Sequence, residues 1–204
     1  MRKLLFFLTF VPILAQAQIG IKAGANFSNV TSAAQISPGN RAGFVAGIFL
    51  APNTKGIIGS RTELLFSRQG YNYATGTSSG NVNLSYLVIP QYMTINITRF
   101  VQIQVGGQMA FLLNAKGDSS TASGNKVPYG NVMSYYNKFD YGFGGGIELH
   151  PVAGWIIGAR VSIGLAKLYS SLQMGQMPAF SASDAKNNVV QVFTGWKFGG
   201  NSKK

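Results

Sequence analysis

Alternation of apolar residues with polar or glycine residues recurs along this chain, and this feature most limits the folds open to it. In residues 100–114 the odd-numbered positions carry Val, Ile, Val, Gly, Met, Phe and Leu, whereas Gln, Gly, Ala, Leu and Asn fill the even ones after Phe100. A period of two residues is the pattern of a β-strand with two unlike faces. The same pattern is found at residues 19–27, 140–149, 155–165 and 190–198.

Three further segments resemble strands but alternate less regularly, at residues 41–51, 57–73 and 82–97. The last of these is apolar on both faces, so the sequence leaves open which face turns inward. It also contains Pro90, which cannot donate a hydrogen bond to a ladder and therefore predicts a bulge or an irregular point. Together the segments predict eight strands.

The connections between these strands differ in length in a regular way. Residues 52–56, 96–99 and 150–154 are short turns. Longer connections rich in Ser, Thr, Gly and Asn occupy residues 30–40, 74–81, 117–135 and 170–186. Short turns at one end and long loops at the other predict an antiparallel up-and-down meander. An even strand number with this asymmetry is typical of outer-membrane barrels, whose short turns face the periplasm.

Membrane chemistry explains why such a sheet would be closed. No apolar run after Gln18 approaches the length of about twenty residues that a spanning helix needs, which excludes a helical membrane protein. A sheet can lie in hydrocarbon only if it closes, because an open edge leaves backbone groups unpaired. Apolar residues make up 46% of the chain and charged residues only 11%. We therefore predict an all-β fold, an eight-stranded antiparallel up-and-down transmembrane β-barrel; a soluble ligand-binding barrel is the alternative.

The first residues predict export. Arg2 and Lys3 precede the apolar residues 4–14, which end in Ala15-Gln16-Ala17. This is the layout of a secretory signal peptide. We expect residues 1–17 to be a cleaved signal peptide and residues 18–204 to form the outer-membrane barrel, with both termini in the periplasm. The chain has no cysteine, which excludes a lipoprotein anchor, disulfides and thiolate metal sites.

The charge balance is strongly basic, with 17 Lys and Arg against five acids and a formal net charge of +12. The basic residues are scattered and form no basic-aromatic motif, so nucleic acid is not a predicted partner. Lipid head groups are the predicted partner of these basic residues instead. We expect an ion-pair network inside the barrel, because an unpaired charge there is costly; its role is structural, or alternatively an ion or proton pathway. Its predicted members are Lys22, Arg61, Glu63, Asp140, Glu148, Arg160 and Lys197.

Aromatic and glycine residues have predicted places as well. Rings near strand ends are candidates for interfacial girdles, although some could fill the interior instead. These rings are Tyr71, Tyr73, Tyr86, Tyr141, Trp155, Tyr169, Trp196 and Phe198. Gly142, Gly144 and Gly146 fall on the inward face, where they would leave room for long neighbouring side chains or let a small barrel curve.

No catalytic, metal-binding or cofactor-binding residue is predicted, and no cofactor is expected. His150 is the single histidine, and beside Pro151 in a short turn it is expected to be solvated. A metal site or a catalytic triad needs several such groups together. The long connection 170–186 contains the apolar residues Met174, Met177 and Phe180. They form either a partner-binding patch or a cover packed over the barrel mouth.

Four stretches carry a resemblance to a known family: residues 20–28 (GIKAGANFS), 62–70 (TELLFSRQG), 86–90 (YLVIP) and 106–116. In them the chain resembles the PorT-like outer-membrane β-barrel family of Bacteroidota. The resemblance implies insertion by the barrel-assembly machinery, with residues 190–198 similar to an aromatic-ended insertion signal. Six residues follow Phe198, which departs from barrels that end on the aromatic. The founding member is associated with type IX protein secretion, whereas most relatives have no assigned activity.

The sequence thus predicts an integral outer-membrane barrel without catalytic activity. It would be structural or bind a protein partner through its extracellular loops, and only the family resemblance links it to secretion. The alternatives are a barrel hydrolase acting on lipid or peptide at the outer rim, and a small pore.

Overall fold

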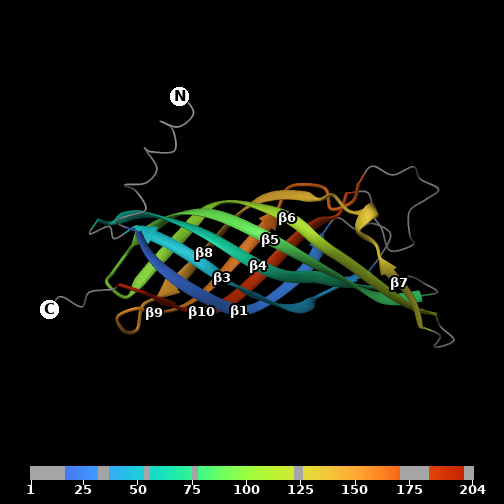
Figure 1. Ribbon diagram of the computed structural model, residues 1–204, viewed down its shortest axis with the longest axis horizontal. Coiled ribbons are helices and arrows are strands. Elements are labelled where there is room, and N and C mark those ends of the chain that lie inside the picture. The colour runs from blue at the N-terminus through green and yellow to red at the C-terminus, as the bar shows by residue number, and fades with distance from the viewer. Residues whose placement is uncertain are drawn as a thin grey trace, which may run out of the picture.

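The structure is a closed antiparallel barrel. The computed structural model describes residues 17–31, 37–52, 56–74, 78–121, 126–170 and 184–199. Each strand of the ring is hydrogen-bonded to two neighbours, and pairing of β1 with β10 and of β4 with β5 completes the ring (Figure 1). The predicted fold class is confirmed. The eight ring strands are β1 (Ala17–Thr31), β3 (Arg41–Pro52), β4 (Ile58–Ala74), β5 (Ser78–Asn96), β6 (Val101–Thr121), β8 (Phe139–Leu149), β9 (Trp155–Gly164) and β10 (Lys186–Lys197).

Three short elements lie outside the ring. Strand β2 (Ser37–Gly39) pairs with the end of β4, and β7 (Lys126–Asn131) pairs with the end of β6. A single 3₁₀ turn, η1 (Met133–Tyr135), follows β7. The described residues contain no helix with the length and hydropathy to cross a membrane.

The two faces of the barrel wall differ in the way that the alternation predicts. Along β9, every second residue from Ile156 to Gly164 is buried, and those between are mostly exposed. Large apolar side chains are exposed on every strand of the ring; examples are Ile21, Phe44, Phe66, Met93, Val105, Phe143, Val161 and Val192. A monomeric protein in water rarely exposes apolar patches beyond a few hundred Å². A continuous outer belt of this kind therefore belongs in lipid.

One side of the barrel stands higher than the other at the long-loop end. Strands β4, β5 and β6 have 17, 19 and 21 residues, whereas β8, β9 and β10 have 11, 10 and 12. We call the ends of the long strands, with β7, the raised wall: residues 68–74, 78–85, 114–121 and 126–131. The eight residues 114–121 extend about 27 Å along the strand. Figure 1 shows β7 at the end of the barrel opposite the start of β1 and the end of β10.

The raised wall corrects two predicted loops. The segment 117–135 is not one loop, because β6 continues to Thr121 and turns back as β7, with a register shift between Gly117 and Asp118. Likewise, β5 begins at Ser78, inside the predicted loop 74–81. A ladder outside hydrocarbon needs no apolar face, so the alternation that marks a strand ends before the ladder does.

The predicted irregularity at Pro90 takes the form of a gap in pairing. The β4–β5 ladder runs in one register from Ile58 with Ile95 to Ala74 with Ser79, but skips Glu63 and Leu64 opposite Ile89 and Pro90. The missing proline N–H accounts for the gap. The even-numbered residues of β5 from 82 to 94 are buried, which settles the facing that the sequence left open.

Candidate functional site

Five charged side chains meet inside the barrel near its short-turn end. We call them the ion-pair layer: Lys22, Arg61, Glu63, Glu148 and Arg160. None is more than 3% exposed. They reach the interior because each occupies an inward-facing position on its strand, on the opposite face of the wall from the apolar belt. All five belong to the set predicted from the sequence.

Glu63 is one centre of the ion-pair layer. Arg160 donates from Nη1 to Glu63 Oε2 at 2.8 Å and from Nη2 to Oε1 at 3.0 Å. Lys22 Nζ adds a third hydrogen bond to Glu63 Oε2 at 3.2 Å. A bidentate guanidinium with a further ammonium saturates this carboxylate, which is what a buried charge requires.

Glu148 is the second centre. Arg61 donates to it from both terminal nitrogens, with Nη2 2.7 Å from Oε1. Gln104 Nε2 donates to Glu148 Oε2 at 3.0 Å, while its carbonyl oxygen accepts from Arg160. The glutamine therefore links the two carboxylate centres into one network.

Aromatic rings complete the layer and offset its excess positive charge. Lys22 Nζ lies 3.5 Å from the centroid of the Phe193 ring. The guanidinium carbon of Arg61 lies 4.5 Å from Phe49, and that of Arg160 lies 4.0 Å from Tyr92. Three cations face two carboxylates, so ring faces that attract cations stabilise the remaining charge. Every ring strand contributes: β1 Lys22, β3 Phe49, β4 Arg61 and Glu63, β5 Tyr92, β6 Gln104, β8 Glu148, β9 Arg160 and β10 Phe193.

Two predicted members of the network lie elsewhere. Asp140 is eight residues before Glu148 on β8, about 27 Å away along the strand, and forms no salt bridge within the described residues. Lys197 lies two residues beyond Gly195, the partner of Lys22, and so reaches the short-turn mouth instead. Both face inward, but at other heights of the barrel.

The prediction that the His150 side chain is solvated is wrong. Its side chain is only 20% exposed, and Nε2 lies 3.2 Å from Glu148 Oε1. The backbone N–H of His150 donates to the carbonyl of Phe100 at 2.8 Å, which keeps the residue on the end of the ladder. His150 directly follows β8 in extended continuation of the ladder and is two positions after Glu148, so both side chains turn to the same face.

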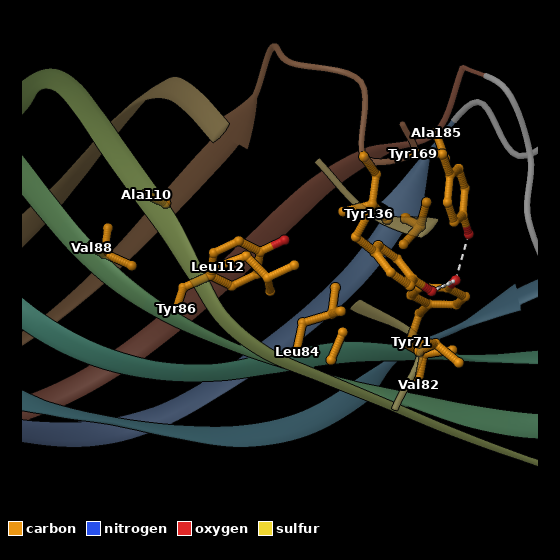
Figure 2. Close-up of a cluster of buried hydrophobic side chains, with 14 of the residues drawn as sticks. Tyr71, Val82, Leu84, Tyr86, Val88, Ala110, Leu112, Tyr136, Tyr169 and Ala185 are labelled. Atoms are coloured by element: carbon orange, nitrogen blue, oxygen red, sulfur yellow. Dashed lines mark hydrogen bonds between the residues drawn. The ribbon is translucent and has the colours of Figure 1, made fainter. Parts of the chain in front are cut away.

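A second cluster, the mouth cluster, closes the long-loop end. Figure 2 shows Tyr71, Tyr136 and Tyr169 converging from three segments of the chain. The Tyr71 hydroxyl is hydrogen-bonded to the hydroxyl of Tyr136 at 2.7 Å and to that of Tyr169. Buried apolar side chains surround them: Val30, Val82, Leu84, Ala115, Val132, Leu168 and Ala185.

Half of the rings that were candidates for the interfacial girdle lie inside the barrel instead. Tyr71, Tyr73, Tyr86 and Tyr169 are at most 3% exposed and lie inside. The other four rings, Tyr141, Trp155, Trp196 and Phe198, face outward with 40% to 49% exposure. Trp155 donates from Nε1 to Thr194 Oγ1 at 2.9 Å, so its polar edge is satisfied on the outer wall. Whether a ring faces inward or outward depends on its odd or even position along the strand, not on its distance from the strand end.

Sequence reasoning missed several residues that contact the ion-pair layer. Gln104 stands on the polar face of its segment, so alternation placed it inward but did not single it out. Phe49, Tyr92 and Phe193 are aromatic residues on inward positions. Small residues opposite make room for two of them: a Cβ added to Gly20 would lie 2.1 Å from the Phe49 ring, and one added to Gly158 would lie 2.5 Å from the Phe193 ring.

Between the ion-pair layer and the mouth cluster the interior is packed. A cavity in this part of the barrel has a volume of about 20 Å³ and is bordered by Leu65, Gln69 and Gln191. A water molecule occupies about 30 Å³ in the liquid, so this space holds at most about one. Among the described residues, no group of three His, Cys, Asp or Glu side chains could hold a metal ion.

A closed antiparallel ring with an apolar outer belt and a charged, packed interior defines a transmembrane β-barrel protein. The chain matches the model of the outer membrane protein beta-barrel domain family over residues 14–170. It belongs to this family and is an outer-membrane protein.

Several solved structures share the fold at low sequence identity. The attachment invasion locus protein Ail of Yersinia pestis aligns with a TM-score of 0.51 at 15% identity, covering 90% of this chain and 99% of that one. The neisserial surface protein A (NspA) aligns with a TM-score of 0.56 at 12% identity, covering 88% and 97%. No curated protein sequence matches the chain.

Proposed function

We propose that this chain is a non-catalytic outer-membrane barrel that acts as a structural platform and binds a partner at its long-loop end. The observation that carries the proposal is the closed interior. The ion-pair layer and the mouth cluster fill the barrel at two heights, and a cavity of about 20 Å³ lies between them. Side chains that fill the barrel at two heights leave no continuous path for a solute along its axis, so we place partner binding on the outer surface of the long-loop end.

The short-turn end would face the periplasm and the long-loop end the cell exterior, as in other barrels of this class. The raised wall then projects outside the membrane and presents an ordered polar surface. Arg41 holds three asparagine side chains of this surface in place. It donates hydrogen bonds to Asn83 at 2.8 Å, to Asn72 at 2.9 Å and to Asn81 at 2.7 Å. Asp118 accepts from the backbone N–H of Asn81 at 2.7 Å. An ordered polar surface loses little conformational entropy on binding.

Several sequence predictions remain predictions. Membership of the PorT-like branch and a link to protein secretion rest on the quoted sequence motifs, as does insertion by the barrel-assembly machinery. Residues 1–16 of the predicted signal peptide lie outside the described residues. So do Met174, Met177 and Phe180, which we retain as candidate partner contacts.

Single cysteines test the orientation, since the chain has none of its own. Lys116→Cys lies on the raised wall, and Val152→Cys lies in the short turn after β8; both side chains are exposed. In intact cells a membrane-impermeant maleimide should label the first variant, and label the second only after the outer membrane is permeabilised. Labelling with the opposite preference would refute the orientation.

Partner binding is tested by a photo-crosslinking residue at position 116, with position 161 as the control. Val161 faces lipid at 49% exposure, so its crosslinks report only membrane neighbours. We expect a discrete adduct in living cells from position 116 and none of that mass from position 161. If positions 72, 81, 116 and 118 of the raised wall all give no adduct, the barrel is structural only.

A further inference from the structure

A pocket of about 360 Å³ opens at the short-turn mouth of the barrel, on the mouth side of the ion-pair layer. Its lining includes the cationic side chains of Arg61, Arg99 and Lys197, together with His150. No aspartate or glutamate is among the described residues that line it. The pocket is therefore concave and positively charged.

Two of these cations lack an acidic partner among the residues that the structure describes. Arg61 is committed to Glu148, but Arg99 and Lys197 form no salt bridge within the described part of the chain. Lys197 is half-buried on an inward position of β10. A partly buried ammonium without a counter-charge is unfavourable, and an anion bound beside it would remove that cost.

Neutral groups of the pocket are held in place by the β5–β6 turn. Thr98 Oγ1 accepts from the backbone N–H of Phe100 at 3.1 Å and of Val101 at 3.0 Å. Its hydroxyl proton can then donate to a ligand. Gln102 Nε2 donates to Asn96 Oδ1 at 2.7 Å, which fixes both amides at the wall. Donors positioned before binding reduce the entropy lost when a ligand is bound.

We propose that this pocket binds a phosphate group. A phosphate carries up to two negative charges and several acceptor oxygens, which suits two uncompensated cations and neutral donors better than a carboxylate with one charge. The volume equals roughly twelve liquid water molecules at about 30 Å³ each. It therefore holds the phosphate together with a glycerol-sized or sugar-sized group. The ligand is either a soluble phosphate ester or a phospholipid head group.

Binding of glycerol 3-phosphate to the full chain, folded in a zwitterionic detergent without phosphate, tests the proposal by isothermal titration calorimetry. Lys197→Gln removes one unpaired cation, and Arg99→Gln removes the other from an exposed turn. Each should weaken binding at least tenfold, about the value of one charge-assisted hydrogen bond. Lys186→Gln is the matched control, since it makes the same charge change at the opposite end of β10.

Two further measurements identify the source of the phosphate. Native mass spectrometry of the barrel extracted from membranes would show a retained phospholipid that Lys197→Gln releases, if the head group is the ligand. Binding of glycerol 3-phosphate without a retained lipid assigns a soluble ester. Succinate titrated in the same way should bind more weakly than glycerol 3-phosphate.

The proposal is overturned if the wild-type chain binds neither glycerol 3-phosphate nor a phospholipid. It is also overturned if Lys186→Gln weakens binding as much as Lys197→Gln, since the effect would then reflect net charge, or if succinate binds as tightly as the phosphate ester. Heat-dependent mobility in electrophoresis confirms that each variant is folded before it is titrated.

Discussion

At the scale of single residues, Glu63 holds the ion-pair layer together. It accepts from Arg160 and Lys22, and Arg61 Nη1 lies 3.9 Å from its Oε1. Removing one partner of a buried ion pair leaves the others charged in a medium that solvates them poorly. Glu63 therefore carries more of the layer's stability than any cation around it, because each cation has an aromatic ring or a second partner.

Glu63→Ala should lower the stability of the folded barrel by about 3–5 kcal/mol, because Arg160 and Lys22 lose their common counter-charge. Thermal unfolding in detergent micelles, followed by circular dichroism, measures the effect. Leu64→Ala changes the adjacent residue, which faces lipid at 43% exposure, and should lower the melting temperature much less. An unchanged melting curve for Glu63→Ala would show that the layer does not stabilise the barrel.

Gly20 and Phe49 form a small and large pair inside the barrel, and their effects should be coupled. Gly20→Ala places a Cβ 2.1 Å from the Phe49 ring, which is fully buried against Arg61. Overpacking of this kind costs about 1–3 kcal/mol. In a double-mutant cycle, Phe49→Leu should recover part of the melting temperature lost in Gly20→Ala. Strictly additive effects would argue against the contact.

At the scale of elements, the membrane part of each strand could be predicted and the raised wall could not. Alternation is imposed by lipid on one side and a packed interior on the other, so residues 155–165 closely match β9. Outside the membrane the outer face of the wall is polar as well, and Lys116, Asp118 and Ser120 follow no apolar alternation. The ladder there is set by pairing with β5 and β7, which a single segment does not reveal.

The candidate site shows the same division. Parity along a strand placed Lys22, Arg61 and Arg160 inside. Which charges meet depends on height along the barrel axis, and that is fixed by the stagger between strands. Asp140 and Glu148 share parity and strand, yet only Glu148 lies level with Arg61. The sequence alone therefore predicts whether a side chain faces inward or outward, but not its height along the barrel axis.

The η1 segment depends on its tyrosine anchor. Tyr136→Phe removes the hydrogen bond to Tyr71, while Tyr71 keeps its bond to Tyr169. The loss should be about 1 kcal/mol and local. Amide hydrogen exchange should quicken at residues 132–136 and stay unchanged in β9. Uniform acceleration across the barrel would mean that the anchor supports the whole fold.

The same anchor should weaken at alkaline pH. Burial, then the neighbouring Tyr169, raises the pKa of Tyr136 well above its ordinary value of 10.0. A folded-state pKa above the unfolded one contributes stability that is complete below the unfolded pKa and is lost as the pH rises beyond it. Exchange protection at residues 132–136 should therefore be constant from pH 7 to about pH 9.5 and fall above about pH 10. Tyr136→Phe should reduce this alkaline dependence without abolishing it, because burial also raises the pKa of Tyr71.

At the scale of the whole molecule, the net positive charge is divided between interior and rims. The ion-pair layer absorbs three cations, while Arg68 and Lys116 are exposed towards the long-loop end and Arg99 at the short-turn end. Between the rims, the outer belt is apolar. Cations at both edges of a hydrocarbon belt lie where anionic head groups attract them. The excess of basic residues thus fits a protein that lies in a membrane.

A barrel closed at two heights should not conduct ions. Purified wild-type protein in planar bilayers should give no stable current steps, because the ion-pair layer fills the cross-section and about 20 Å³ remains above it. Tyr136→Ala combined with Tyr169→Ala opens only the mouth cluster, so this variant should also stay silent. Removing the layer as well, with Glu63→Ala and Arg160→Ala added, is the variant expected to leak small ions. Stable, ion-selective steps from the wild type would instead make the interior the functional path and overturn the platform function.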